Sequence, residues 1–245
     1  MLQCRRRSEC YVPRRFAVKT IGVIGGIGPQ ATIDFEARLH AASQKLIPPR
    51  ANSGYPPLLV YYHRAPPLVT GEDGALLIHP ALLEKLEAFG ALADFLVIPS
   101  NYTHILREAF EQVSGRKVLS MIDITVAEVR NRGWQLTGLL GMGEPRVYMD
   151  SFDRLGLRYE TLSGDLVALR TRLDSSIIAV MEGQEGPADK AAAMEAVHTL
   201  RGKGVDGIVL GCTEIPLLMG EAANAPDLIN PTALLAEAAV RYALQ

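Results

Sequence analysis

One cysteine of this sequence lies where a thiol could do acid/base or nucleophilic chemistry. Cys212 stands in the segment Gly211-Cys-Thr-Glu-Ile-Pro216, directly after an apolar run and where a helix is expected to begin. A helix N-terminus lowers the pKa of a thiol from about 8.5, and the thiolate is the reactive form. Thr213 and Glu214 are candidates for holding a substrate. A buried, inert cysteine is the alternative, but the flanking glycine and Thr-Glu pair argue against a packing role.

A second polar segment, Ser100-Asn-Tyr-Thr-His104, also follows an apolar run. Asn101 and Thr103 could bind carboxylate oxygens, and Tyr102 is a further candidate for substrate binding. Alternatively, Ser100 and Asn101 only cap the helix that follows, a position that suits both residue types. His104 either tunes the site or packs against that helix.

The glycine-rich segment Gly25-Gly-Ile-Gly-Pro29 links a predicted strand to a predicted helix. Its glycines, Gly26 among them, can bring backbone amides close to an anionic ligand, and a plain tight turn is the alternative. The spacing does not match the dinucleotide fingerprint, so we expect no NAD and no other cofactor.

Two other kinds of site are not favoured by the sequence. Neither HExxH nor CxxC is present, and the histidines lack metal-ligand spacing, so no metal is predicted. The histidines are His40, His63, His79, His104 and His198. A Ser-His-Asp hydrolase would need a GxSxG elbow, which is also absent.

Short apolar runs that alternate with helical periodicity must position these residues. We expect strands at 20–24, 58–62, 95–99, 137–141 and 207–211, and helices at 29–46, 75–91, 102–113, 121–132 and 188–203. Runs that are apolar on both faces are typical of buried parallel strands. The pattern predicts a doubly wound α/β fold with mainly parallel sheets.

The sequence also resembles itself. Residues 20–29 resemble 136–145, and residues 93–101 resemble 205–213, so that Asp94 matches Asp206 and Ser100 matches Cys212. Two matches at similar spacing predict two related Rossmann-like lobes with pseudo-twofold symmetry. Because ligands bind beyond the carboxyl ends of parallel strands, Ser100 and Cys212 should face a shared cleft. We assign 20–124 with 230–245 to the first lobe and 125–229 to the second.

Composition narrows the class of partner. The chain has 245 residues, a formal net charge of -2 and a pI near 6.2, which gives no support for nucleic acid or an anionic membrane. No apolar run reaches the roughly 18 residues of a membrane span. Three cysteines are too few for a disulfide framework, so we expect a cytoplasmic protein. Residues 1–19 are rich in arginine and predicted to be a disordered tail, with an upstream start codon or a transit peptide as alternatives.

Three motifs resemble the aspartate/glutamate racemase superfamily: IGVIGGIGPQAT at 21–32, IPSNYTH at 98–104 and LGCTEIPLL at 210–218. The likeness spans residues 20–242. It implies two α/β lobes, an active site between them, no cofactor, a small amino-acid or carboxylate substrate, and a homodimer. In that family a thiol from each lobe flanks the substrate Cα, one removing the proton and the other donating one.

Four positions depart from that pattern. Ser100 stands where the family usually has its first cysteine. Leu68 stands where aspartate racemases carry an arginine, and Arg64 is the candidate to replace that arginine. Gln184 replaces an expected lysine, and Glu144 is introduced where threonines are usual. Without these cations, a second substrate carboxylate would be expensive to bury. We therefore expect a neutral, apolar or cationic distal group, with Glu144 as a partner for an amine.

Three functions are consistent with these residues. The first is an amino-acid racemase or epimerase in which Cys212 exchanges the Cα proton and Ser100 relays protons on the other face. The second is a single-cysteine decarboxylase or isomerase of a carboxylic acid. The third is a catalytically weakened relative that only binds a small carboxylate.

Overall fold

A computed structural model describes residues 18–48, 54–64 and 66–245, so most of the predicted N-terminal tail lies outside the described residues. The elements of the first half are, in chain order, β1 (Ile21–Gly25), α1 (Pro29–Leu46), β2 (Leu58–Tyr62), β3 (Leu68–Thr70), β4 (Leu76–Ile78), α2 (Pro80–Leu92), β5 (Phe95–Val97), the 3-10 helix η2 (Tyr102–Leu106), α3 (Arg107–Ser114) and α4 (Met121–Asn131). The second half contains β6 (Leu136–Leu140), α5 (Arg146–Leu155), β7 (Arg158–Glu160), η3 (Gly164–Leu166), α6 (Val167–Glu182), α7 (Pro187–Gly202), β8 (Gly207–Leu210), α8 (Glu214–Met219), η4 (Gly220–Asn224), β9 (Leu228–Ile229) and α9 (Pro231–Ala243).

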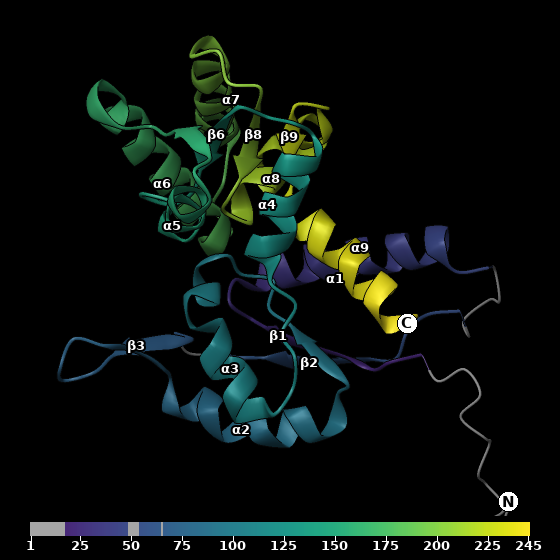
Figure 1. Cartoon of the computed structure of the whole chain (residues 1–245). Coiled ribbons are helices and arrows are strands. Elements are labelled where there is room, and N and C mark those ends of the chain that lie inside the picture. The colour runs from purple at the N-terminus through teal and green to yellow at the C-terminus, as the bar shows by residue number, and fades with distance from the viewer. Residues whose placement is uncertain (1–17, 49–53, 65) are drawn as a thin grey trace, which may run out of the picture.

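Two parallel sheets form the two lobes that Figure 1 shows one above the other. The first has the order β2-β1-β5 and the second the order β7-β6-β8-β9. The strands nearest the centre of each sheet pair in parallel, β1 with β5 and β6 with β8. An isolated parallel bridge between Leu96 and Val118 occupies in the first lobe the place that β9 has in the second. The predicted α/β class with two similar lobes is confirmed.

The internal repeat is also visible in the hydrogen bonds. A carboxylate oxygen of Asp94 accepts from the amide of Thr20 at 2.7 Å, and a carboxylate oxygen of Asp206 accepts from the amide of Leu136 at 3.0 Å. In return, the amides of Asp94 and Asp206 donate to the carbonyls of Thr20 and Leu136. The two aligned aspartates therefore make the same connection between the two central strands of each lobe.

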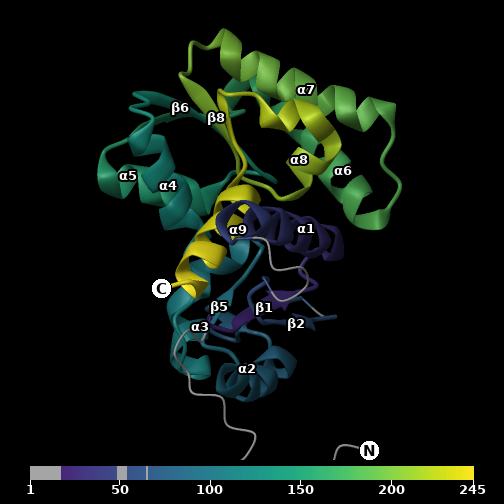
Figure 2. The same cartoon turned by 90° about the vertical axis from the view of Figure 1, so that its right-hand side faces the viewer.

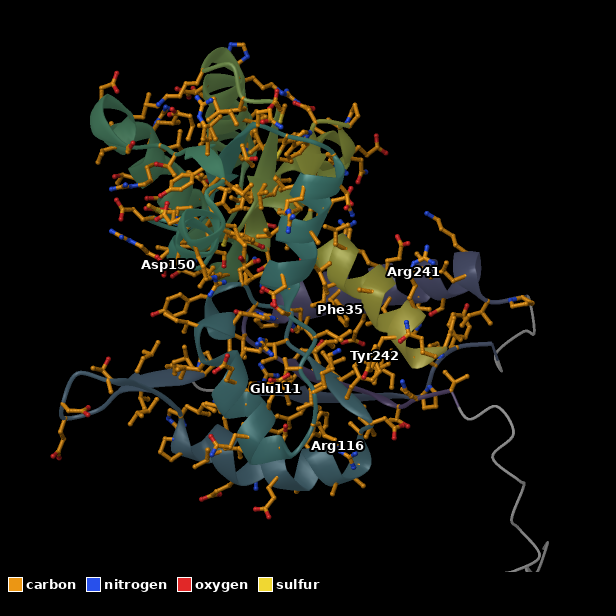
Figure 3. All side chains as sticks on the ribbon, viewed as in Figure 1. Phe35, Glu111, Arg116, Asp150, Arg241 and Tyr242 are labelled. Carbon is orange, nitrogen blue, oxygen red and sulfur yellow. The ribbon has the colours of Figure 1, made fainter. Side chains whose placement is uncertain are left out.

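The C-terminal helix α9 returns to the first lobe. It packs against α1 and α4, and Figure 2 shows α9 and α1 lying between the two sheets. Phe35 of α1 is fully buried in this core, and Tyr242 of α9 packs against the same cluster (Figure 3). The domain boundary predicted at residues 124/125 falls inside α4, a helix that contacts both α9 and α5.

Several elements differ from the sequence expectation. Leu68, expected in a loop, begins β3, which forms an antiparallel hairpin with β4 and pairs with no other described strand. Helix α2 therefore begins at Pro80 rather than at 75, and the predicted helix at 102–113 is divided into η2 and α3. The helices α5, α6 and α9 and the short strands β7 and β9 were not predicted. Strands of two or three residues are too short to show a period.

Proline marks the start of several helices. Pro29, Pro187 and Pro231 stand in the first turn of α1, α7 and α9, where a missing amide costs no helical hydrogen bond. Among the residues that the structure describes, no helix is both long and apolar enough to cross a bilayer.

Candidate active site

The ends of β5 and β8 open onto one cavity of about 510 Å³ between the lobes. The first lobe contributes Ser100, Asn101, Tyr102 and Thr103, and the second contributes Gly211, Cys212, Thr213 and Glu214. The structure thus brings together the two polar segments that the sequence singled out. They meet because each segment follows the carboxyl end of a parallel strand, and these ends lie at a common edge of each sheet.

The thiol of Cys212 is hydrogen-bonded to a buried carboxylate. Cys212 Sγ donates to Glu214 Oε2 across 3.0 Å, and the hydroxyl of Thr213 donates to the same oxygen across 2.9 Å. Glu214 is only 2% exposed. A buried carboxylate whose recorded donors are a neutral thiol and a neutral hydroxyl is poorly compensated, and such groups are common at functional sites.

The pKa of Cys212 is raised well above its ordinary value, which corrects the expectation that a helix N-terminus would lower it. Burial is the largest cause, followed by the negative charge of Glu214 and the hydrogen bond to it. The backbone amides of Glu214 and Met142 act in the opposite direction but do not outweigh these effects. The thiol is therefore protonated at neutral pH.

The glycine that faces this carboxylate is Gly28, not Gly26. Gly28 lines the cavity at a φ of 43°, and a Cβ added there would lie 2.7 Å from Glu214 Oε1. The amide of Gly26 donates to the hydroxyl of Thr32 across 2.9 Å, and Gly26 is not part of the cavity lining. Its amide is thus occupied by the protein itself, and the predicted role of Gly26 in anion binding receives no support from the geometry.

Across the cavity, Ser100 is paired with another hydroxyl. Ser100 Oγ and Thr103 Oγ1 lie 2.9 Å apart, and both residues are buried. The structure records no hydrogen bond between the Ser100 hydroxyl and a carboxylate or an imidazole in the described part of the chain. The two faces of the cavity are therefore chemically unequal, with an ionisable pair on one side and a pair of hydroxyls on the other.

His104 is a packed residue of this strand end rather than a base for Ser100. Its Nε2 accepts from the amide of Met121 at 3.0 Å, so its Nδ1 carries the proton and donates to the carbonyl of Ser100 at 2.8 Å. Burial lowers the pKa of His104 and keeps the ring neutral. Both ring nitrogens are used in holding Ser100 and the start of α4 together.

Asn101 lines the cavity and has an unpaired donor. Its Oδ1 accepts from the hydroxyl of Tyr148 at 2.6 Å, whereas its Nδ2 is buried and has no hydrogen-bond partner among the described residues. An unpaired buried amide costs about 1–3 kcal/mol. A ligand carboxylate at this point would satisfy it.

The remainder of the lining is largely apolar: Ile27, Pro67, Met142, Val147 and Met181. Neither Arg64 nor Gln184, both predicted to face the substrate, belongs to the lining, and both are exposed. Glu144 does line the cavity, but its carboxylate pairs with Arg146, which also lines the cavity, and approaches Arg170 at 3.8 Å. A substrate amine would compete there with two guanidinium groups.

Three of the lining residues that the sequence analysis missed come from helices it did not predict. Arg146 and Val147 begin α5, and Met181 is near the end of α6. Met142 lies within the recognised segment Gly141-Met-Gly-Glu-Pro145 and Arg146 directly follows it, so their position next to a strand end was the available signal.

A second hollow of about 380 Å³ lies between η2, α3, α4 and α5, and its lining includes neither Cys212 nor Ser100. Within the described ranges 18–48, 54–64 and 66–245, no group of three or more His, Cys, Asp or Glu side chains is arranged to hold a metal ion.

Comparison with known proteins places this cavity in context. The family model described as Asp/Glu/Hydantoin racemase matches residues 24–239. Over 227 residues the chain is 22% identical to the broad specificity amino-acid racemase RacX of Bacillus subtilis (strain 168), covering 90% of this chain and 96% of that protein.

Solved structures agree on the fold. An aspartate racemase homologue from Pyrococcus horikoshii OT3 aligns with a TM-score of 0.72 at 18% identity, covering 93% of this chain and all of that chain. The Picrophilus torridus aspartate racemase aligns with a TM-score of 0.68 at 21% identity, over 92% of this chain and 94% of that one. At such identities these likenesses show a shared fold.

Proposed function

The chain belongs to the Asp/Glu/hydantoin racemase family of isomerases, and on that premise we propose that it is a cofactor-independent amino-acid racemase or epimerase. In this proposal Cys212 exchanges the Cα proton on one face of the substrate, and Ser100 relays a proton on the other. The observation that carries the proposal is the 3.0 Å hydrogen bond from the Cys212 thiol to the buried Glu214 carboxylate inside the interlobe cavity.

Glu214 would act as the proton acceptor for the thiol. Because the pKa of Cys212 is raised, the thiol reaches its basic form by passing its proton to Glu214 Oε2. The thiolate then takes the proton from Cα, and the electron pair of the broken C–H bond is left on the substrate. A carboxyl group bound by Asn101 Nδ2 would help to stabilise that negative charge, since a donor already in place costs no reorganisation.

On the opposite face, the Ser100 hydroxyl would give its proton to Cα and recover one from Thr103, which lies 2.9 Å away. Thr103 is in turn reprotonated by solvent in the cavity, and Glu214 returns its proton to solvent, so that both faces regain their starting state. Serine is a weaker acid and, without an adjacent base, a poorer proton acceptor than a thiolate. Removal of the proton should therefore be faster on the Cys212 face than on the Ser100 face.

The substrate is proposed to carry a neutral or apolar distal group. The apolar side chains of Ile27, Met142 and Met181 support this, together with the absence of Arg64 and Gln184 from the lining. Among the lining residues described, Arg146 is the basic side chain, and Glu144 already neutralises it. An acidic distal group would have to displace that pair.

Hydrogen exchange in deuterium oxide tests the proposal. The protein is incubated with the L and D forms of alanine, methionine, lysine and aspartate, and deuterium at Cα is followed by mass spectrometry, with chiral chromatography of the products. We expect exchange with alanine or methionine, a loss of at least about 100-fold in Cys212→Ser, and little exchange with aspartate. Full exchange in Cys212→Ser would refute the assignment, and binding without exchange would indicate a ligand-binding relative.

Ser100→Cys examines the other face. A thiol there should raise racemisation in both directions, whereas Ser151→Cys should not, because Ser151 is similarly buried but lies outside the cavity lining. No rise in Ser100→Cys would place Ser100 outside the proton-transfer path.

A decarboxylase is the second candidate, favoured by the protonated state of the thiol at neutral pH. In that reaction the bond from Cα to a carboxyl group breaks, carbon dioxide leaves, and the electron pair on Cα takes the proton of Cys212. Glu214 or solvent then returns a proton to sulfur. Carbon dioxide release from phenylmalonate, with no deuterium exchange into amino acids, would support this candidate over the racemase.

A further inference from the structure

One tyrosine that the proposed chemistry does not use links the two lobes beneath the cavity. Tyr148 lies on α5 in the second lobe, and its side chain is fully buried. Its hydroxyl donates across 2.6 Å to Oδ1 of Asn101, which follows β5 in the first lobe. A side chain of one lobe therefore holds a cavity-lining side chain of the other.

The ring of Tyr148 also contacts the backbone that precedes the thiol. A Cβ added to Gly211 would lie 3.0 and 3.1 Å from the Cε2 and Cδ2 atoms of that ring. The glycine thus allows the strand end to lie directly against the tyrosine, and Cys212 is the next residue. Tyr148 touches both strand ends that build the site.

The hydrogen bond determines which end of the Asn101 amide is left unpaired. An amide has one accepting and one donating end, and Oδ1 is used by Tyr148, which leaves the buried Nδ2 unpartnered. In a flipped amide, Nδ2 would donate to the tyrosine oxygen. The proton of Tyr148 would then have only Thr125 Oγ1, at 3.5 Å, among its recorded neighbours.

Tyr148 keeps its proton over the whole working range, because burial raises its pKa far above the ordinary value for a phenol. It is thus a permanent donor to Asn101. The orientation of the amide does not change with pH.

We propose that Tyr148 is a positioning residue for substrate binding, whose hydroxyl fixes the Asn101 amide so that Nδ2 points at the substrate carboxylate. The inference rests on the proposed function, which supplies that carboxylate. It adds a contact between the lobes that couples carboxylate binding in the first lobe to the strand end that carries the thiol in the second.

The kinetic test compares the intact wild-type chain with Tyr148→Phe, Asn101→Ala and the double variant, with L-alanine as substrate. Phenylalanine keeps the ring against Gly211 and removes only the hydroxyl. We expect KM to rise about tenfold while kcat stays within about threefold, because a binding interaction is lost. The double variant should bind no more weakly than Asn101→Ala, since both changes remove one interaction. Tyr159→Phe is the matched control. The Tyr159 hydroxyl lies 3.4 Å from a carboxylate oxygen of Asp153, and Tyr159 is not part of the cavity lining.

A binding measurement separates this inference from the proposed function. L-Alanine is titrated into ¹⁵N-labelled protein, and the side-chain amide signals of Asn101 are followed after their assignment by loss in Asn101→Ala. We expect Kd to rise about tenfold in Tyr148→Phe, with the Asn101 signals shifted even without ligand. The melting temperature of each variant shows that it is folded.

Each outcome decides one of the two ideas. If the wild type binds L-alanine without exchanging its Cα proton, the proposed function fails and the titration still tests Tyr148. An unchanged Kd in Tyr148→Phe, unmoved Asn101 signals, or additive losses in the double variant would overturn the positioning role. No binding of L-alanine by the wild type would overturn both.

Discussion

Replacing Glu214 with glutamine tests whether its carboxylate takes the proton of Cys212. Glutamine keeps the size of the side chain and an oxygen that can accept from Cys212 and Thr213, but it cannot take up a proton. Two unit charges separated by 3.0 Å, the distance from Sγ to Oε2, repel by about 5 kcal/mol at an effective dielectric constant near 20. The two groups therefore do not readily carry negative charge together, and the proposed relay requires the carboxylate to take the proton that the thiol gives up.

Two opposite changes are expected in Glu214→Gln. The pKa of Cys212 should fall, because two of the causes that raise it are the charge of Glu214 and the hydrogen bond to it, so iodoacetamide should alkylate the thiol faster at pH 8 than in the wild type. Deuterium exchange at Cα should nevertheless drop about 100-fold at pH 7, because the local base is gone. Exchange should then recover only as pH rises above the ordinary thiol pKa of about 8.5, because burial still raises the pKa of Cys212 in the variant.

The assays are alkylation followed by intact-mass spectrometry and Cα deuterium exchange between pH 6 and 10. Glu237→Gln serves as control, since Glu237 is a half-exposed partner of Arg241 on α9. Faster alkylation combined with slower exchange is the expected signature. Undiminished exchange at pH 7, or alkylation no faster than in the wild type, would refute the relay.

Three further predictions concern the scaffold of the site. Burial lowers the pKa of His104 in the folded protein. The stability contributed by its neutral ring is therefore fully present above the unfolded pKa of about 6.5 and is lost as pH falls through the lower folded pKa. In His104→Asn, the melting temperature should fall less steeply between pH 7 and 5. Gly28→Ala should cost about 1–3 kcal/mol, because its φ of 43° and ψ of 119° are unfavourable for alanine, and it should reduce exchange more than tenfold by displacing Glu214. Gly204→Ala, at φ 77° with open space, should cost stability alone. Phe152→Ala should lower the free energy of unfolding in urea by about 3–5 kcal/mol, because Phe152 is fully buried. Leu155→Ala should lower it far less, because Leu155 is half-exposed.

The sequence alone determined the architecture and the two polar segments of the site. Strands that are apolar on both faces require burial between helices, and this pattern is local, so it could be recognised in the residues of β1, β2, β5, β6 and β8. The equivalence of Ser100 with Cys212 followed from the repeat, and both line one cavity because parallel strands end at a common edge. The family assignment followed from the motifs at those edges.

The tertiary structure decided the properties that depend on distant segments. The pKa of Cys212 is raised rather than lowered because burial and a carboxylate at 3.0 Å outweigh a helix terminus, and the burial of this thiol depends on segments that are distant in the sequence. Arg64 and Gln184 were placed at the substrate by position in the sequence, but neither residue belongs to the cavity lining. The role of Tyr148 could not be predicted from sequence motifs, because its partner Asn101 lies in the other lobe and only the packing of the two lobes brings their side chains together.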